Sequence, residues 1–421
     1  MRELDNLASH LEVLLKDVRG EAQKSNIDLL KIPSWLWGWQ SPWKGRQNAG
    51  ELLNEGENEV YHIAVRIREK FPDLFDEEYH SDTFVIKATQ VPRASASAVA
   101  FGIGLFNGRG SLGAGKDRAF AVTSESRAND ILLRFFDCCA NYKEYLKNQA
   151  PAVEKLKEPI LDEIMSALVS RYQLSFTRQD TASLWFLCKL EASLLDITGQ
   201  ACSLFTPSEI LLLEWTDDLE LFILRGYGNS INYLMGVPLL EDVFHSMEQA
   251  IMFKEENLIP GTYEKARLRF AHAETLIPFS CLLGLFLEGS EFEQIQREKP
   301  LELPPKPPQQ RNWKSSMMAP FAGNIMMVLY SCPDKNSSKY FVQVLHNEVP
   351  LSMPGCDNKD FCPFDVFKER IVNVLLKPDY DSLCSAKLEV QEPKPSTSML
   401  TQLYRSLFWQ DGETQENKVE L

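Results

Sequence analysis

The sequence lacks any apolar run long enough to cross a bilayer. A transmembrane helix needs roughly 18 or more consecutive apolar residues, whereas the longest runs here are short pieces such as CLLGLFL at 281–287. The first 20 residues interleave leucines with charges, as an amphipathic helix does, and contain no unbroken apolar stretch of a secretory signal. We therefore expect a protein without a membrane span, and a cytosolic one as the sequence is written.

The sequence also lacks positive charge. Its 44 lysines and arginines face 59 carboxylates, which gives a formal net charge of -15. This balance argues against nucleic acid or an anionic membrane as a partner. An anionic small molecule would have to be held by a local basic pocket.

A third absence concerns metal sites. The nine cysteines form no CxxC pattern, so we predict no metal site. Cys356 and Cys362 are close enough in sequence for a small disulfide loop in an oxidising compartment, and buried free thiols are an equally acceptable interpretation. Asn336 begins an NSS glycosylation signal, which matters only if the chain enters the secretory pathway.

Hydrophobic periodicity divides the chain. A helix over 54–75, a strand over 83–90, a helix over 94–106 and a strand over 118–126 give the rhythm of an α/β fold. Helical patterns then continue without strands, and strands return near 266–274 and in a hairpin over 324–351. We predict three parts: an α/β domain over 1–127 and 241–392, an inserted helical domain over 128–240, and a polar, disordered tail over 393–421.

A histidine and a glutamate close the strand of residues 266–274. Because side chains alternate along a strand, Leu268, Phe270, His272 and Glu274 share one face, with the polar pair at the carboxyl end. Ligands of α/β sheets bind at this end. A histidine that hydrogen-bonds an anion beside a carboxylic acid suits phosphate ester cleavage. The plainer alternative is a solvated pair that caps the following helix.

A second cluster comes after the strand of residues 83–90. Arg93 is located just after a Thr-Gln-Val-Pro turn, and small residues over 94–97 begin a helix. Free N–H groups at a helix start and a guanidinium fork both favour an oxyanion. A surface arginine at a helix start is the alternative.

The stretch GSLGAGKD at 110–117 matches part of a phosphate-cradling loop and raises a nucleotide-dependent kinase or ATPase as another function class. Asp117 replaces the Ser or Thr that would bind magnesium, and the stretch precedes a strand instead of following one. We interpret it as a turn.

Several motifs together resemble plant multiple inositol polyphosphate phosphatases, a branch of the histidine acid phosphatases. They are SPWKGR, GELLNEGENEVYHIAVRIREKFPDLFDEEY, KATQVPRASASAVAFGIGL, FAVTSESRANDILLRFFD, FAHAETLIPF and FAGNIMMVLYSCP. The likeness covers nearly the whole chain, and His-Ala-Glu is specific to this branch. It implies a mixed α/β sheet flanked by helices, with an inserted all-helical domain.

The resemblance implies a metal-independent phosphomonoesterase without a cofactor. Arg93 would clamp the transferred phosphate, His272 would hydrogen-bond it, and Glu274 would protonate the leaving inositol oxygen. Lys44 and Arg46 would hold other phosphates of the substrate. The family also implies a monomer located in the endoplasmic reticulum or secreted.

One family motif has no counterpart. The family's nucleophile is the histidine of an Arg-His-Gly-x-Arg segment, and none of the six histidines here is preceded by Arg or followed by Gly. The first residues resemble the stretch just downstream of that segment in the family. We therefore expect that the first strand and the nucleophile are missing and that this chain is inactive and weakly stable. A non-catalytic inositol phosphate-binding protein and a defective fragment are the alternatives.

Overall fold

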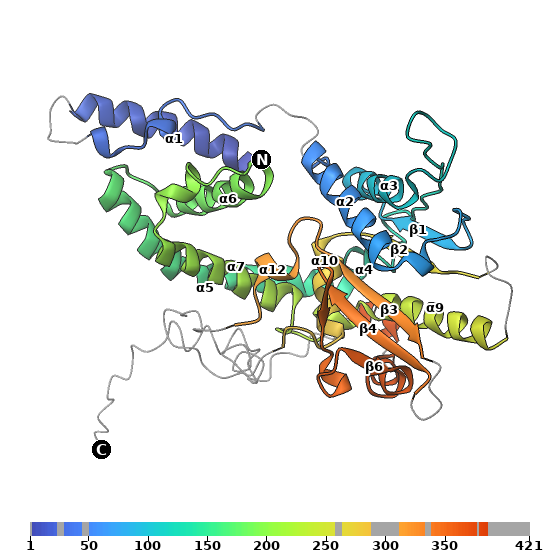
Figure 1. Cartoon of the computed structure of the whole chain (residues 1–421). Coiled ribbons are helices and arrows are strands. Elements are labelled where there is room, and N and C mark those ends of the chain that lie inside the picture. Colours follow the sequence, from blue (N-terminus) through green and yellow to red (C-terminus); the bar gives the residue numbers. More distant parts are fainter. Residues whose placement is uncertain are drawn as a thin grey trace, which may run out of the picture.

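The computed structural model describes residues 2–22, 29–43, 50–256, 263–287, 311–332, 338–376 and 379–385 (Figure 1). The chain is rich in helices, and its described strands form two small sheets. The predicted α/β fold is confirmed, with the strands divided between two sheets. No helix in these ranges is long and apolar enough to cross a membrane.

The first sheet consists of two parallel strands beside two helices. β1 (Phe84–Ala88) pairs with β2 (Ala266–Phe270) so that Ala88 lies opposite Phe270. Next to this sheet, α2 (Asn54–Lys70) and α3 (Pro92–Phe106) lie side by side (Figure 1). The parallel register places the carboxyl ends of both strands at one edge.

Apolar spacing and one glycine explain how α2 and α3 pack. Val60, Ile63, Ala64 and Ile67 recur at helical spacing, and all are buried. At Gly104 of α3, an added Cβ would lie 2.5 Å from the backbone oxygen of Tyr61 in α2. The two helices therefore approach more closely than any larger residue at this position would allow.

The predicted strand over 118–126 is wrong. Only Thr123 forms a bridge, to Lys87 of β1. Its N–H donates to Ile86 O at 3.0 Å and its carbonyl accepts from Ala88 N at 2.9 Å. Most of the segment is exposed, so its alternating pattern lacks the burial that would extend the pairing.

Residues 128–240, all described, contain helices and no strand. Two of them begin with capping boxes, in which Thr177 pairs with Asp180 and Thr206 with Glu209. The helices of this region are α4 (Phe135–Cys138), α5 (Ala140–Tyr172), α6 (Arg178–Leu195), α7 (Pro207–Arg225), α8 (Ile231–Leu234) and the start of α9 (Val237–Glu255).

The first helix, α1 (Arg2–Ala22), packs against α6 in this helical region (Figure 1). Its leucines share a buried cluster with residues of α5, α6 and α7. At its edge, His10 Nδ1 lies 2.9 Å from the buried carboxylate of Asp180. The domain boundaries 1–127, 128–240 and 241–392 stay a prediction. The helix α1, which that prediction assigns to the α/β domain, packs into the core formed by α5, α6 and α7.

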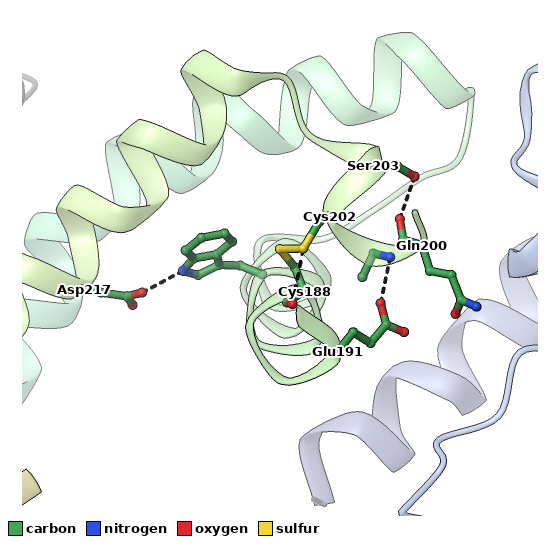
Figure 2. Close-up of a disulfide and its surroundings, with 8 residues drawn as sticks. Cys188, Glu191, Gln200, Cys202, Ser203 and Asp217 are labelled. Carbon is green, nitrogen blue, oxygen red and sulfur yellow. Dashed lines mark hydrogen bonds between the residues drawn. A yellow bond between two sulfur atoms is a disulfide. The ribbon is translucent and has the colours of Figure 1, made fainter. Parts of the chain in front are cut away.

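A disulfide joins α6 to the segment that comes after it (Figure 2). Cys188 of α6 pairs with Cys202, and the buried carboxylate of Glu191 accepts a hydrogen bond from Ala201 N at 3.0 Å. Ser203 donates to Gln200 O at 2.7 Å within the same turn. These contacts fix the loop between α6 and α7.

The second sheet is antiparallel. β4 (Tyr340–His346) pairs with β3 (Ile325–Ser331), β5 (Val349–Leu351) and β6 (Phe361–Pro363). The predicted hairpin is thus present, and part of its connection lies outside the described residues, as does Asn336. Helical segments of this region are α10 (Ala273–Leu282), α12 (Ser315–Met318), α13 (Phe364–Phe367), a π-helical turn (Lys368–Val372), α14 (Asn373–Leu375) and α15 (Tyr380–Ser385). The tail over 393–421 lies outside the described residues.

An edge strand of each sheet lies at the same cavity. Among the described strands, β2 pairs only with β1, and β3 pairs only with its neighbour β4. Both β2 and β3 line the same cavity of about 1830 Å³. All their residues are half-buried, so this cavity separates the two sheets along their unpaired strands.

Disulfides account for six of the nine cysteines. They are Cys139–Cys384, Cys188–Cys202 and Cys356–Cys362, while Cys138, Cys281 and Cys332 are free. The structure thus pairs Cys356 with Cys362. The pair Cys139–Cys384 joins the start of α5 to α15 and closes a sequence separation of 245 residues.

Candidate active site

The carboxyl ends of β1 and β2 bring together two segments that are far apart in the sequence. Thr89 N donates to Phe270 O at 3.0 Å, which extends the parallel pairing by one step. The chain beyond Phe270 therefore passes next to Thr89. His272 follows two residues after Phe270, as the N-cap residue of α10, and its carbonyl accepts from Thr275 N at 2.9 Å.

The His272 ring lies among donors and positive charge. Its Nε2 is 2.9 Å from Thr89 Oγ1 and 2.9 Å from Arg134 Nη1. Burial, then the charges of Arg134 and Arg93, lower the pKa of His272 from 6.5 to about 4. The imidazole is therefore neutral near neutral pH and can accept a proton when an anion compensates the positive charge.

Arg134 lies at the N-cap of the short helix α4, and its side chain is only 12% exposed. Its Nη2 donates to the Asp137 carboxylate, and its guanidinium lies 5.2 Å from the Phe136 ring centre. The same ring makes an edge contact with His272. Both contacts hold the guanidinium toward the imidazole.

Glu274 lies in the first turn of α10, one residue beyond the helix start. The strand predicted over 266–274 ends at Phe270, so the shared strand face predicted for His272 and Glu274 is wrong. Its Oε1 is 3.5 Å from Nη2 of Arg225, the last residue of α7. Both side chains are about one-third exposed, at 36% and 30%. The acid group is thus accessible from solvent and is held by a cation from the helical region.

Arg93 lies in the first turn of α3 and is exposed. Its charge acts on His272, and its Nη1 would be 3.6 Å from a Cβ added at Gly50. Arg93, His272 and Glu274 line the same cavity as β2 and β3. The structure therefore brings together the three residues that the two sequence clusters single out, although their roles stay predictions.

Other predicted residues are not placed. Lys44 and Arg46 lie outside the described residues, so their role in holding further phosphates stays a prediction. Among the described residues, no group of three or more His, Cys, Asp or Glu is arranged to hold a metal ion.

Sequence reasoning missed three residues of the site: Thr89, Arg134 and Arg225. Thr89 belongs to the turn that precedes Arg93 and could have been identified there. Arg134 lies in LLRFFD, where an arginine between apolar residues is an unusual pattern for a core segment. Arg225 ends a helix and carries no comparable signal in the sequence.

The stretch 110–117 forms a tight turn. Leu112 bridges Asp117, and Gly110 N donates to Lys116 O at 2.7 Å. A Cβ at Gly110 would lie 2.0 Å from Asp117 O, so the glycine permits this close approach. The Gly110 N–H and the Lys116 carbonyl thus bond to each other within the turn. This favours the interpretation of the stretch as a turn over that of a nucleotide-binding loop.

Comparison with known proteins identifies multiple inositol polyphosphate phosphatases and acid phosphatases as relatives. The chain is 27% identical over 410 residues to multiple inositol polyphosphate phosphatase 1 of Dictyostelium discoideum, covering 84% of this chain and 62% of that protein. It is 26% identical to the proteins of the same name from Gallus gallus and Homo sapiens, covering 88% and 76% of this chain. It spans 79% of the length of the first and 64% of the second.

Solved structures share the fold. The phytase from D. castellii matches with a TM-score of 0.62 at 15% identity, covering 91% of this chain and 78% of that one. A Bifidobacterium longum multiple inositol polyphosphate phosphatase, in complex with inositol hexasulfate, matches with a TM-score of 0.55 at 18% identity, covering 76% and 79%. The family model of the histidine phosphatase superfamily (branch 2) matches residues 10–347. The chain therefore belongs to the histidine phosphatase superfamily, branch 2.

Proposed function

We propose that this chain carries the phosphate site of an inositol polyphosphate phosphomonoesterase at the carboxyl end of β2. The observation that supports it most is that Arg93, His272 and Glu274 line one cavity. Behind them, Arg134 contacts His272 and Arg225 lies beside Glu274. This local positive charge offsets the acidic character of the whole chain. A polyanion such as phytate is the ligand class that such a cluster favours.

Each group has a chemical role in this proposal. The guanidinium of Arg93 donates to oxygens of the phosphoryl group, whose charge it stabilises. His272 hydrogen-bonds the same group. The Glu274 carboxyl, at the solvent-accessible side, protonates the leaving inositol oxygen. All three roles are supplied by side chains, so the proposal needs no metal ion.

The covalent step of the family needs a nucleophile that these 421 residues do not supply in the family's motif. None of the six histidines stands in an Arg-His-Gly-x-Arg segment. His272 takes the hydrogen-bonding role, which leaves it unavailable for attack. We propose that this chain binds inositol phosphates and does not hydrolyse them through phosphohistidine.

The disulfides favour an oxidising compartment. Stable disulfides are rare in the cytosol, and three pairs are formed here. We therefore propose location in the endoplasmic reticulum or secretion, in preference to the cytosol. A monomer and the absence of a nucleic acid partner remain part of the proposal.

Calorimetry with inositol hexakisphosphate, together with phosphate release near pH 5, tests this function. We expect affinity on the order of micromolar and no release. Arg93→Gln should weaken binding by roughly tenfold or more, because it removes charge-assisted hydrogen bonds, while Arg178→Gln on α6 should not. Release that Glu274→Gln abolishes would show that another residue attacks phosphorus. Absence of binding by a cooperatively folded chain would reject the site.

A further inference from the structure

One hydrogen bond determines the protonation state of His272. Its Nε2 lies 2.9 Å from Arg134 Nη1 and 2.9 Å from Thr89 Oγ1. A guanidinium can only donate hydrogen bonds. Nε2 must therefore be the acceptor and carry no proton, and the ring proton of the neutral imidazole sits on Nδ1.

Arg134 is held in place and still has donor capacity. The Asp137 carboxylate and the Phe136 ring fix its guanidinium, and its backbone N donates to Asp130 O at 2.8 Å. Its buried Nε has no hydrogen-bond partner among the described residues. Leaving a buried donor unpaired costs about 1–3 kcal/mol, so an anion at this point would satisfy it.

The charges around His272 make its protonation depend on an anion. Burial most of all, then Arg134 and Arg93, disfavour the imidazolium, whereas Glu274 and Asp137 favour it more weakly. Thr89 is uncharged and can accept from or donate to the ring. A bound dianion would reverse this balance, because it adds negative charge beside both arginines and the ring.

We propose that Arg134 is a phosphate-binding and positioning residue that holds His272 as a neutral acceptor in the empty site and turns to the phosphate when one binds. This inference rests on the phosphate site proposed above. Arg134 then donates to one phosphate oxygen. Nε2 takes up one proton from solvent, keeps it, and donates a hydrogen bond to another oxygen, so binding consumes one proton and strengthens as the pH falls from 7 to 5.

Sulfate is a suitable probe, because it keeps its charge across this pH range whereas phosphate titrates. The protonation of Nε2 is read from ¹⁵N NMR of histidine-labelled full chain at pH 5, with and without sodium sulfate. Calorimetry in buffers of different ionisation enthalpy counts the protons taken up. In the parent chain, we expect an unprotonated Nε2 that becomes protonated with sulfate, and an uptake near one proton.

Arg134→Gln should change three readings. The titration midpoint of His272 should rise from about 4 by roughly one pH unit or more, because a neighbouring positive charge is lost. Sulfate affinity should fall by about tenfold or more. Proton uptake at pH 5 should fall well below that of the parent, because the ring is already partly protonated.

Two further variants separate charge from geometry and folding. Arg134→Lys keeps the positive charge but loses the planar guanidinium with its paired donors. The titration midpoint of His272 should therefore stay near that of the parent, while sulfate should still bind more weakly. Arg178→Gln removes a half-buried arginine of α6 that pairs with Asp162 and has no contact with the site, so it should change none of the readings. Circular dichroism establishes that each variant is folded.

The outcomes distinguish this inference from the proposed function. If the parent binds sulfate and Arg134→Gln matches it in midpoint, affinity and proton uptake, the role of Arg134 is rejected and the phosphate site stands. If the parent binds no sulfate while Arg134→Gln still raises the midpoint, the anion-binding role and the proposed site are rejected, and only the positioning role survives.

Discussion

At the scale of single residues, Asp130 shows how burial without full pairing affects stability. Its side chain is fully buried, Oδ1 accepts from Leu133 N at 2.9 Å, and Oδ2 has no partner among the described residues. Burial, as the largest cause, raises the pKa of Asp130. Its ionised form at neutral pH is thus unfavourable to the fold.

We therefore expect Asp130→Asn to be more stable than the parent at pH 7. Asparagine keeps the acceptor for Leu133 N and removes the buried charge. Because the folded-state pKa is the raised one, the folded parent binds more protons than the unfolded chain as the pH falls through it. The parent thus gains stability on acidification, and the difference between the two should disappear.

Urea denaturation at pH 7, 5.5 and 4 measures this difference. A variant less stable than the parent at pH 7 would mean that Lys87 and Arg134, which lower the pKa of Asp130, stabilise the carboxylate more than burial penalises it.

At the scale of elements, the disulfides differ in how much chain they constrain. Cys139–Cys384 closes 245 residues and Cys188–Cys202 closes 14. The chain-entropy model gives about 3 kcal/mol for a loop of about 15 residues and more than about 4 for the longer one. The first pair also holds α15 against α5, where Asn141 Nδ2 donates to Leu383 O at 2.7 Å.

The double variant Cys139→Ser/Cys384→Ser should therefore lose more stability than Cys188→Ser/Cys202→Ser, by about 2–3 kcal/mol on the same model. Denaturation of both under non-reducing conditions compares them. Equal losses would indicate that α15 is held mainly by noncovalent contacts and that the long loop is already compact when unfolded.

At the scale of the whole molecule, the strands that line the cavity between the two sheets should be the least stable part of the α/β region. The strands β2 and β3 each have one edge without a strand partner, and backbone groups there rely on solvent. Hydrogen exchange is fastest where backbone groups open easily. The chain's core strand β4, paired on both sides, provides the internal comparison.

Hydrogen exchange with mass spectrometry should thus show faster exchange in 266–270 and 325–331 than in 340–346. Inositol hexakisphosphate should slow exchange around 272–276, where the site adjoins β2. Protection of β2 and β3 equal to that of β4 would mean that the cavity walls are as stable as the core.

The elements that the sequence predicts correctly are those that depend on residues close to each other in the sequence. Val60, Ile63, Ala64 and Ile67 mark one helix face without reference to the rest of the chain, and the helix is present. The local pattern was insufficient at 118–126. There the alternation of apolar and polar residues predicts a strand, but only Thr123 forms a bridge, to Lys87. A strand requires a partner edge, which a short segment does not specify.

Sequence alone determined that His272 and Glu274 come just after a strand and that Arg93 begins a helix, because apolar patterning and helix starts are local properties. It did not determine that the strand ends at Phe270 and that Glu274 belongs to α10. Only the tertiary structure brought Thr89, Arg134 and Arg225 to them. Thr89 is 183 positions from His272 and Arg134 is 138 positions away. Contacts over such separations depend on how β1, α4 and α7 pack around β2, and that packing is decided by burial of the whole chain.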